Sequence, residues 1–308
     1  MSIPEELQVL TTIRDLVRWG TSEFERHQLN FGHGFATALD EAQYLTLHAL
    51  ELPFDLDDGY LDAVLTLTER EQVIERLCLR VESRQPAAYI TRESWFCGLR
   101  FYVDERVLVP RSPIAELIAN HFEPWTDSHR VERILDLCCG SGCIGIAAQY
   151  HFPDATVCLS DLSADALDVA TLNLQEHDLD DAIERYQSDL FDSIPAQRFD
   201  IIVSNPPYVD AEDMAALGAE YHAEPEIGLA AGTDGLALVE RILDGAVNYL
   251  SDQGVLFIEV GNSQAAMEQK YDFLPMAWID FEMGGAGVCC IQAQDLRQQH
   301  TAITAIAS

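Results

Sequence analysis

Positive charge is what this sequence has least of. Lys270 is its single lysine, and 18 Lys and Arg stand against 52 Asp and Glu, for a formal net charge of −34 in 308 residues. Such a chain is repelled by nucleic-acid phosphates unless a local basic groove offsets its charge, and no run of arginines supplies one. We therefore expect no DNA partner. The charge itself has two compatible interpretations, adaptation to high salt and attraction to a basic protein.

Long apolar runs are missing as well. No stretch approaches 18 uninterrupted apolar residues, so we expect no membrane-spanning helix. Residues 1–10 have neither the basic nor the apolar region of a secretory signal. We expect a soluble, cytoplasmic protein with no membrane partner, and 308 residues suffice for one α/β domain and a smaller one.

The spacing of a metal site is also absent. Of the eight cysteines, Cys138, Cys139 and Cys143 lie close together but lack the paired spacing that binds zinc. Others stand inside apolar runs, which is typical of small core residues rather than of disulfides. We expect no bound metal.

Apolar periodicity divides the chain into a helical part and an α/β part. A helical period covers the first 85 residues or so, with a turn at Phe31–Gly34 and a helix from Asp40, the candidate N-cap, to Leu50. Two short strands around residues 104–106 predict a hairpin. We expect a helical domain at 1–94, a hairpin linker at 95–112, an α/β domain at 113–294 and a tail at 295–308.

Seven candidate strands follow residue 130, and apolar helical patterns separate most of them. This alternation predicts a doubly wound, Rossmann-like and mostly parallel sheet. The connection between the last two strands is too short for a parallel crossover, so we expect them to be antiparallel. The strands are placed at 133–138, 156–160, 184–188, 199–204, 254–260, 278–282 and 288–292.

Small residues follow the first of these strands and predict a cofactor site. Beyond Asp136, the residues Cys138, Gly140, Ser141 and Gly142 let the backbone approach a ligand closely. The amide groups at the start of the next helix can face a carboxylate. A dinucleotide could use the same geometry, because Gly145 completes a G-x-G-x-x-G spacing, and a purely structural turn is also possible.

Acidic residues end the next two strands. Asp161, about 25 residues past Asp136, is placed to accept two hydrogen bonds from a ribose diol. Asp189 is placed to meet an adenine amino group, and Leu190 to pack on the ring.

The fourth strand ends in Asn205-Pro206-Pro207-Tyr208, which we interpret as the catalytic and substrate-binding turn. The two prolines fix the turn and remove two backbone donors. The side-chain oxygen of Asn205 and the carbonyl of Pro206 can accept both N–H groups of an amide or amine. Tyr208 can stack on a planar group and stabilise a cationic methyl through its ring face. In isolation the tetrapeptide could equally be only a rigid turn.

An amide nitrogen requires such an arrangement because its lone pair is delocalised. Orienting it toward an electrophilic methyl group can supply on the order of 7–11 kcal/mol, and acceptor dipoles add to this. About 65 residues separate the glycine-rich turn from Asn205. The combined pattern predicts a methyltransferase that uses S-adenosyl-L-methionine, with Asn205 also adjoining the cofactor.

These residues resemble the glutamine methyltransferase family that modifies translation components, from about residue 30 to 292. The resemblance rests on Gln85–Ile90, Trp95–Leu99, the strand at Asp136 and Asn205–Tyr208. One branch of the family modifies peptide-chain release factors, and the other modifies large-subunit ribosomal protein L-three. The resemblance implies a class I methyltransferase fold, S-adenosyl-L-methionine as cofactor and a glutamine side-chain amide as substrate.

The ribosomal branch is the more similar one. Phe31–Gly34, Val109–Glu116 and Gly218–Pro225 resemble it, and the release-factor branch typically has Arg-Pro-Asp-Thr-Glu at the second of these segments. Thr91 also replaces a glycine common in the release-factor branch. The expected partner is therefore ribosomal protein L-three, a basic protein. The alternatives are a release-factor methyltransferase, a DNA amino-methyltransferase, for which no basic cleft or target-recognition region is found, and an inactive cofactor-binding assembly factor.

Some residues have two interpretations. Cys138 stands where the family usually has the first glycine of Asp-x-Gly-x-Gly-x-Gly. Arg111 could reach the substrate or the cofactor carboxylate, or form a structural salt bridge. Tyr221, His222 and Glu224 could form a substrate lid or an ordinary surface loop.

Overall fold

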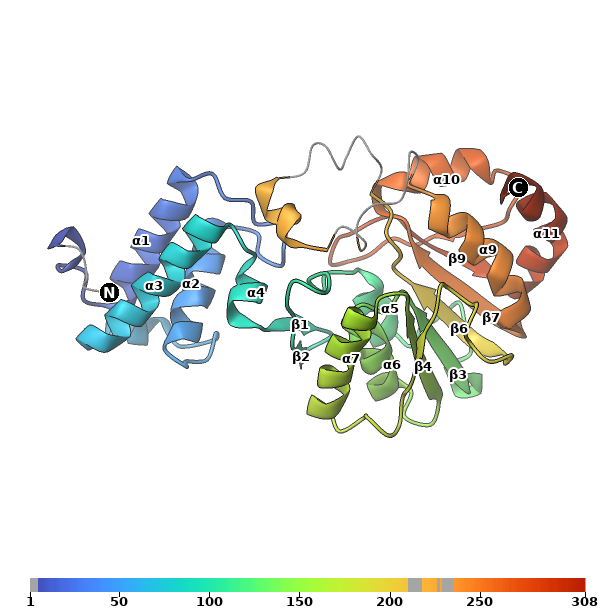
Figure 1. Ribbon diagram of the computed structural model, residues 1–308, viewed down its shortest axis with the longest axis horizontal. Helices are drawn as coiled ribbons and strands as arrows, with labels where there is room; N and C mark the ends of the chain where they lie inside the picture. Colours follow the sequence, from blue (N-terminus) through green and yellow to red (C-terminus); the bar gives the residue numbers. More distant parts are fainter. Residues whose placement is uncertain (1–4, 210–217, 226–227, 229–234, 308) are drawn as a thin grey trace. The chain divides into compact units, whose positions relative to one another are not determined.

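The structure is a computed structural model that describes residues 5–209, 218–225, 228 and 235–307. The first four residues of the predicted helical domain and the last residue of the predicted tail lie outside these ranges. The chain forms two compact units, one of residues 1–93 with 217–223 and one of residues 94–216 with 224–308 (Figure 1). Within the described ranges, no helix combines the length and the apolarity needed to cross a membrane.

The helical unit is built on three amphipathic helices, α1 (Ile13–Arg26), α2 (Ala38–Ala49) and α3 (Leu67–Ser83). Capping boxes begin α1 and α3, and Gly20 permits close packing, since a Cβ there would lie 2.9 Å from Leu77 Cδ1. The core includes Leu16, Phe24 and Leu45. Shorter elements complete the unit: η1 (Glu5–Leu7), η2 (Asp58–Asp62), α4 (Ala87–Thr91) and η4 (Ala219–Ala223).

The start of α2 differs from the prediction. Thr37, not Asp40, is the N-cap, and its hydroxyl oxygen accepts a hydrogen bond from Asp40 N at 3.2 Å. The predicted cap was wrong because both residues are good capping types, and the threonine lies three residues earlier, at the end of an extended segment.

The α/β unit contains a seven-stranded sheet in the order β5-β4-β3-β6-β7-β9-β8. The pairs from β5 to β7 are parallel, and β9 is antiparallel to both of its neighbours. The antiparallel pairing of β8 with β9 was predicted. The strands are β3 (Arg133–Leu137), β4 (Thr156–Asp161), β5 (Glu184–Gln187), β6 (Phe199–Ser204), β7 (Leu250–Glu259), β8 (Ala277–Trp278) and β9 (Val288–Gln292).

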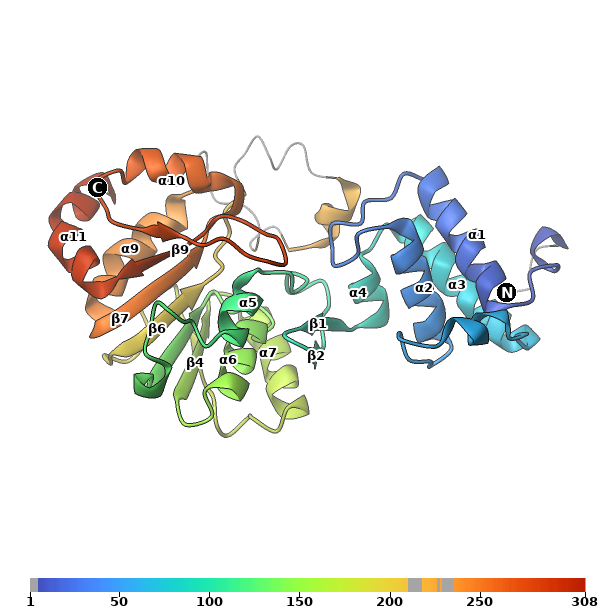
Figure 2. The ribbon, with the colours of Figure 1, turned by 180° about the vertical axis from the view of Figure 1, so that it is seen from behind.

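Helices cover both faces of this sheet, which confirms the doubly wound α/β fold (Figures 1 and 2). Successive strand residues alternate between two cores, so Ile134 packs on one side and Leu135 on the other. One core holds α5 (Ile114–Ala119), α6 (Cys143–His151) and α7 (Ala164–Glu176). The other holds α9 (Ala237–Tyr249), α10 (Gln264–Lys270) and α11 (Ala293–Ala307). Two single 3₁₀ turns, η3 (Ser128–Arg130) and η6 (Gly261–Ser263), lie between these elements.

The tail predicted from residue 295 is mostly the helix α11, in which Leu296 and Ile303 are fully buried. Of the cysteines, Cys158, Cys289 and Cys290 are buried free thiols, as expected for core residues.

The predicted hairpin has its turn in a different place. Strands β1 (Ser94–Phe96) and β2 (Leu99–Phe101) pair around Cys97 and Gly98, both with positive φ. Residues 107–109, all within the described ranges, form no strand. The prediction was wrong because Asp104 forms its own tight turn, accepting a hydrogen bond from Arg106 N at 3.1 Å.

Asn173 on α7 connects the segment after this hairpin to the glycine-rich turn. Its side chain is fully buried and forms hydrogen bonds with both the N–H and the carbonyl of Tyr102, at 2.7 and 3.1 Å. The same amide group donates to the carbonyl of Ser141 at 2.9 Å. The Asn173 side chain therefore links the loop after β3 to the segment between β2 and α5.

We predict that Asn173→Ala lowers the free energy of unfolding by roughly 3 kcal/mol, because it leaves buried backbone groups without partners. Urea denaturation would measure the change. Gln175→Ala, at an exposed position of the same helix, is the control and should change stability by less than about 0.5 kcal/mol. Equal stability of the two variants would contradict this role.

Candidate active site

The carboxyl ends of β3, β4 and β6 meet at one edge of the sheet. Parallel pairing sets Leu137 opposite both Ser160 and Ser204. Ser204 Oγ also donates a hydrogen bond to the carbonyl of Leu137 at 2.7 Å. The segments that follow these strands, including Asp161 and Asn205, therefore leave the sheet side by side, where parallel sheets bind their ligands.

The loop after β3 has the backbone conformation of a glycine motif. Cys138, Gly140 and Gly142 have φ values of +63°, +53° and +77°. Cys138 thus adopts a left-handed conformation that costs an L-residue about 1–2 kcal/mol, which explains why glycine is usual at this position. A Cβ on Gly140 would meet nothing within 4 Å, so this backbone faces open space.

Two carboxylates hold the loop. Asp161 accepts hydrogen bonds from Gly140 N and Ser163 N, both at 2.9 Å. Asp136 is fully buried and accepts a hydrogen bond from Gly145 N at 2.8 Å. Burial raises the pKa of the Asp136 carboxyl to about 7. Among the described residues, none forms a hydrogen bond with its second oxygen, Asp136 Oδ1.

Gly145, the third glycine of the spacing, has a packing role. A Cβ there would lie 2.2 Å from Leu159 Cδ2, so only glycine lets α6 approach the sheet this closely. The third glycine of a dinucleotide motif has the same packing role, so this glycine does not distinguish a dinucleotide from another nucleotide cofactor.

These features fit an S-adenosylmethionine molecule. Helix α6 begins at Gly142 without a side-chain cap, so its first amide groups can bind a carboxylate. The open backbone at Gly140 leaves room for a ligand, and Asp161 lies at the end of β4 where a ribose would be bound.

Asp189, which was predicted to bind the adenine amino group, is paired with a cation instead of being a free carboxylate. Asp189 forms an ion pair with Arg241 at 3.0 Å, and Leu190 is buried with a φ of +50°. Sequence reasoning missed Arg241, which lies on α9, 52 residues further along the chain than Asp189. The one sequence signal for this contact is that Arg241 is the single positively charged residue of α9, whose other residues are mostly apolar or acidic.

The turn after β6 is firmly held. Pro206 is buried, while Asn205 and Tyr208 are half-buried. The carbonyl of Tyr208 accepts a hydrogen bond from Ser263 Oγ at 3.1 Å. A Cβ on Gly261 would lie 2.4 Å from the Tyr208 ring, so the ring packs directly on the backbone at Gly261.

The hydroxyl of Tyr208 donates to Glu259 Oε1 at 3.1 Å. Burial and this neighbouring carboxylate raise the pKa of Tyr208 well above its usual value, so the phenol stays protonated at neutral pH. Glu259 was not among the predicted site residues. A carboxylate directly after the apolar run Val255–Ile258, followed by Gly261, is the signal that could have identified it.

Arg111 forms a salt bridge, one of its two interpretations. Its guanidinium donates to both oxygens of Glu224, at 2.7 and 2.9 Å, and Val109 N donates to the same carboxylate at 3.1 Å. In the helical unit, Tyr221 packs against His33 with ring centroids 4.3 Å apart. The side chain of His222 lies outside the described residues, and the substrate lid stays a prediction.

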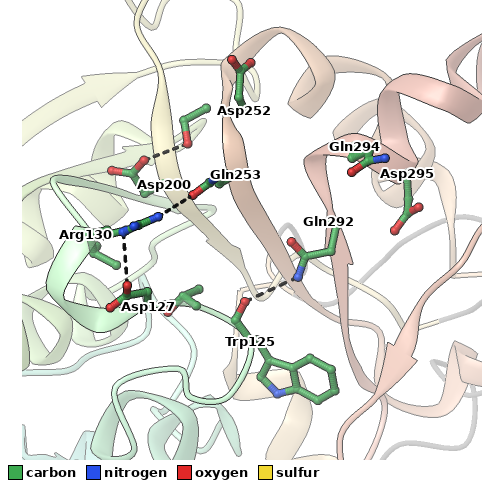
Figure 3. Close-up of a pocket in the computed structure, with 12 residues that line it drawn as sticks. Trp125, Asp127, Arg130, Asp200, Asp252, Gln253, Gln292, Gln294 and Asp295 are labelled. Carbon is green, nitrogen blue, oxygen red and sulfur yellow. Dashed lines mark hydrogen bonds and ion pairs between the residues drawn. The ribbon is translucent and has the colours of Figure 1, made fainter.

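A hollow lies at the opposite edge of the sheet from the carboxyl ends of β3, β4 and β6. This cavity of about 650 Å³ is bordered by residues at the amino ends of β6 and β7, among them Asp200 and Gln253 (Figure 3). Its polar groups bind one another: Ser251 Oγ donates to Asp200 at 2.8 Å, and Arg130 donates to Gln253 at 3.2 Å. The chemistry of a ligand site is instead concentrated at the carboxyl edge.

The sequence of the chain is similar to those of known methyltransferases. The family described as methyltransferase small domain matches residues 115–221. The ribosomal protein uL3 glutamine methyltransferase of Francisella tularensis is 46% identical over 93% of this chain and 92% of its own length. That of Burkholderia pseudomallei is also 46% identical, over 92% and 95%. A methyltransferase crystal structure from Pyrococcus furiosus is 16% identical, covering 64% of this chain and 89% of its own, with a TM-score of 0.47.

The raised pKa of Asp136 predicts how stability varies with pH. Because the folded chain binds this proton more tightly than the unfolded chain, the contribution of Asp136 is fully present below the unfolded pKa, near 4. It is lost as the pH rises toward 7. Asp136→Asn, which keeps an oxygen acceptor for Gly145 N, should therefore be the more stable protein at pH 8, by on the order of 4 kcal/mol.

Denaturant titrations of both proteins at pH 5 and pH 8, without cofactor, would measure this difference, which should shrink at the lower pH. Asp168→Asn, at an exposed position of α7, is the control and should change stability by less than about 0.5 kcal/mol. A loss of stability in Asp136→Asn at pH 8 would show that the buried carboxylate is not destabilising.

Proposed function

The chain belongs to the family of ribosomal protein uL3 glutamine methyltransferases, and from that premise we propose the following activity for it. It transfers a methyl group from S-adenosylmethionine to the side-chain amide nitrogen of a glutamine in large-subunit ribosomal protein L-three, in the cytoplasm. The observation that carries the proposal is the rigid turn Asn205–Tyr208, which leaves β6 directly beside the glycine-rich loop after β3.

We assign the cofactor to the carboxyl edge of β3, β4 and β5. When bound, S-adenosylmethionine supplies an electrophilic methyl group on a sulfonium. The start of α6 receives its carboxylate, Asp161 its ribose, and Asp189 with Leu190 its adenine. The full set of proposed cofactor residues is Asp136, Cys138, Gly140, Ser141, Gly142, Asp161, Asp189, Leu190 and Asn205.

The methyl-accepting nitrogen is held by hydrogen-bond acceptors. The Asn205 side-chain oxygen and the Pro206 carbonyl each accept one N–H of the glutamine amide, which directs the nitrogen along one axis. Because both prolines restrict the turn, little conformational freedom is lost when the amide binds. Developing positive charge on the nitrogen is stabilised by the same two oxygens.

Tyr208 acts as a neutral ring, not as a base. Its phenol stays protonated and donates to Glu259, and its ring packs on Gly261. The ring face can then stack on the planar amide and interact with the cationic methyl group. No side-chain base is assigned, because orientation and charge stabilisation supply the main barrier reduction. The proton that the nitrogen loses on methylation passes to solvent.

The charge of the chain suits the proposed substrate. A net charge of −34 attracts a basic protein and accelerates its encounter at low ionic strength. Adaptation to high salt is compatible with the same composition. Raising the salt concentration during the reaction would separate the two, since steering weakens and salt adaptation does not.

We predict that Asn205→Ala lowers the rate of methyl transfer by at least about 100-fold, because one of the two acceptors is lost at the transition state. Tritiated cofactor is incubated with purified ribosomal protein L-three and, separately, a release factor. Mass spectrometry then locates the added methyl group. Asn248→Ala, at an exposed position of α9, is the control and should retain full activity.

Label in the release factor alone would overturn the proposed substrate but not the chemistry. Undiminished activity of Asn205→Ala would overturn the proposed role of the turn.

A further inference from the structure

Two hydroxyl groups from distant parts of the chain converge on Glu259. Tyr208 donates to Oε1 at 3.1 Å, and Ser112 Oγ donates to Oε2 at 2.5 Å. Glu259 is the last residue of β7, and only 5% of its surface is exposed. Because Ile258 pairs with Ser204 on β6, Glu259 lies beside the start of the catalytic turn.

Burying the charged Glu259 carboxylate between two hydroxyl groups costs free energy, because the charge is removed from water. Burial raises the pKa of the Glu259 carboxyl, and the hydrogen bonds from Ser112 and Tyr208, one to each oxygen, partly offset this by stabilising the ionised form. Hydrogen bonds to an ionised acceptor are roughly twice as strong as those between neutral groups. The arrangement therefore fixes the direction of the Tyr208 hydroxyl more firmly than a neutral partner would.

The position of Glu259 is itself fixed from the other side. The hydroxyl oxygen of Ser112 accepts a hydrogen bond from Ile114 N at 3.1 Å, at the start of α5. Ser112 belongs to the Val109–Glu116 segment, one of those that resemble the ribosomal branch of the family. Arg111, next to it, binds Glu224, so the segment places one cation and one hydroxyl against two buried carboxylates.

We propose that Glu259 is a positioning residue for methyl transfer, which sets the plane of the Tyr208 ring through the hydroxyl hydrogen bond while Ser112 holds its second oxygen. The inference rests on the proposed role of the turn Asn205–Tyr208. Glu259 acts only through the tyrosine and does not contact the substrate. Tyr208 is then held at three points, by Glu259 at its hydroxyl, by Gly261 against its ring and by Ser263 at its backbone carbonyl.

Steady-state kinetics of Glu259→Gln, Tyr208→Phe and the double variant test this coupling. Each single variant should lower kcat by about 10- to 100-fold, with the KM for the protein substrate and the Kd for cofactor changed less than about threefold. The double variant should be no slower than the slower single variant, because Glu259→Gln removes the charge from the acceptor of the same hydrogen bond whose donor Tyr208→Phe deletes. Multiplicative losses would show that Glu259 acts independently of Tyr208 and would overturn the proposal.

The chain offers a matched control pair. On β5, the hydroxyl of Tyr186 donates to Glu184, near the amino end of the strand and away from the catalytic turn. Glu184→Gln and Tyr186→Phe make the same two changes in an equivalent tyrosine–carboxylate hydrogen bond and should change kcat less than about twofold. Circular dichroism of all variants would confirm that each is folded, and Ser112→Ala should give a smaller loss than Glu259→Gln.

Crystal structures of the unliganded wild type and Glu259→Gln separate this inference from the proposed function. The wild type should show one orientation of the Tyr208 ring. The Glu259→Gln variant should show either several orientations or one that is rotated from that of the wild type. That result would support positioning even if methyl transfer occurred on a different protein substrate, for which the same kinetics can be measured. An unchanged ring in the variant, together with unchanged kcat, would overturn the inference and leave the proposed function intact.

Discussion

The pairing of β3 with β6 is the constraint on which the site depends. Leu137 and Ser204 are partners at the ends of these two parallel strands, and the Ser204 hydroxyl closes the pair with a hydrogen bond to the Leu137 carbonyl. A shift of one residue would turn every side chain of β6 to the other core, where it would face different packing partners. The glycine-rich loop and the proline turn consequently begin side by side.

Rigidity around the turn then comes from several weak sources acting on the same few atoms. The prolines restrict the backbone, Gly261 admits the Tyr208 ring, and Glu259 and Ser263 bind its hydroxyl and carbonyl. A poor nucleophile such as an amide gains most from this kind of preorganisation. The groups that orient it are already ordered in the folded protein, so no further ordering is needed during the reaction. The buried Asp136, whose pKa is raised by burial beside the proposed cofactor loop, is a second place where the fold carries a local cost in stability.

Much of this architecture could be predicted from the sequence because its signals are local. Buried strands are short apolar runs, so β6 and β9 were predicted with their observed bounds. The proposed catalytic turn is a contiguous tetrapeptide directly after β6. The hairpin turn was misplaced because Asp104 and Cys97-Gly98 both form tight turns, and their local sequence does not show which of them connects two strands.

The interaction partners that sequence reasoning did not identify lie far apart in the chain. Ser112 and Glu259 are 147 residues apart, and Arg111 and Glu224 are 113 apart. Only the completed sheet brings such pairs together, so neither composition nor spacing specifies them. Arg241 beside Asp189 is another case, since the predicted adenine-binding carboxylate already has a cation as its neighbour.

The most direct test of this arrangement is a crystal structure of the chain with S-adenosylhomocysteine and a glutamine-containing peptide of ribosomal protein L-three. We predict that the glutamine amide nitrogen lies roughly 3 Å from both the Asn205 side-chain oxygen and the Pro206 carbonyl, and faces the cofactor sulfur. A glutamine bound away from these two oxygens, or a turn that faces away from the sulfur, would contradict the central claim.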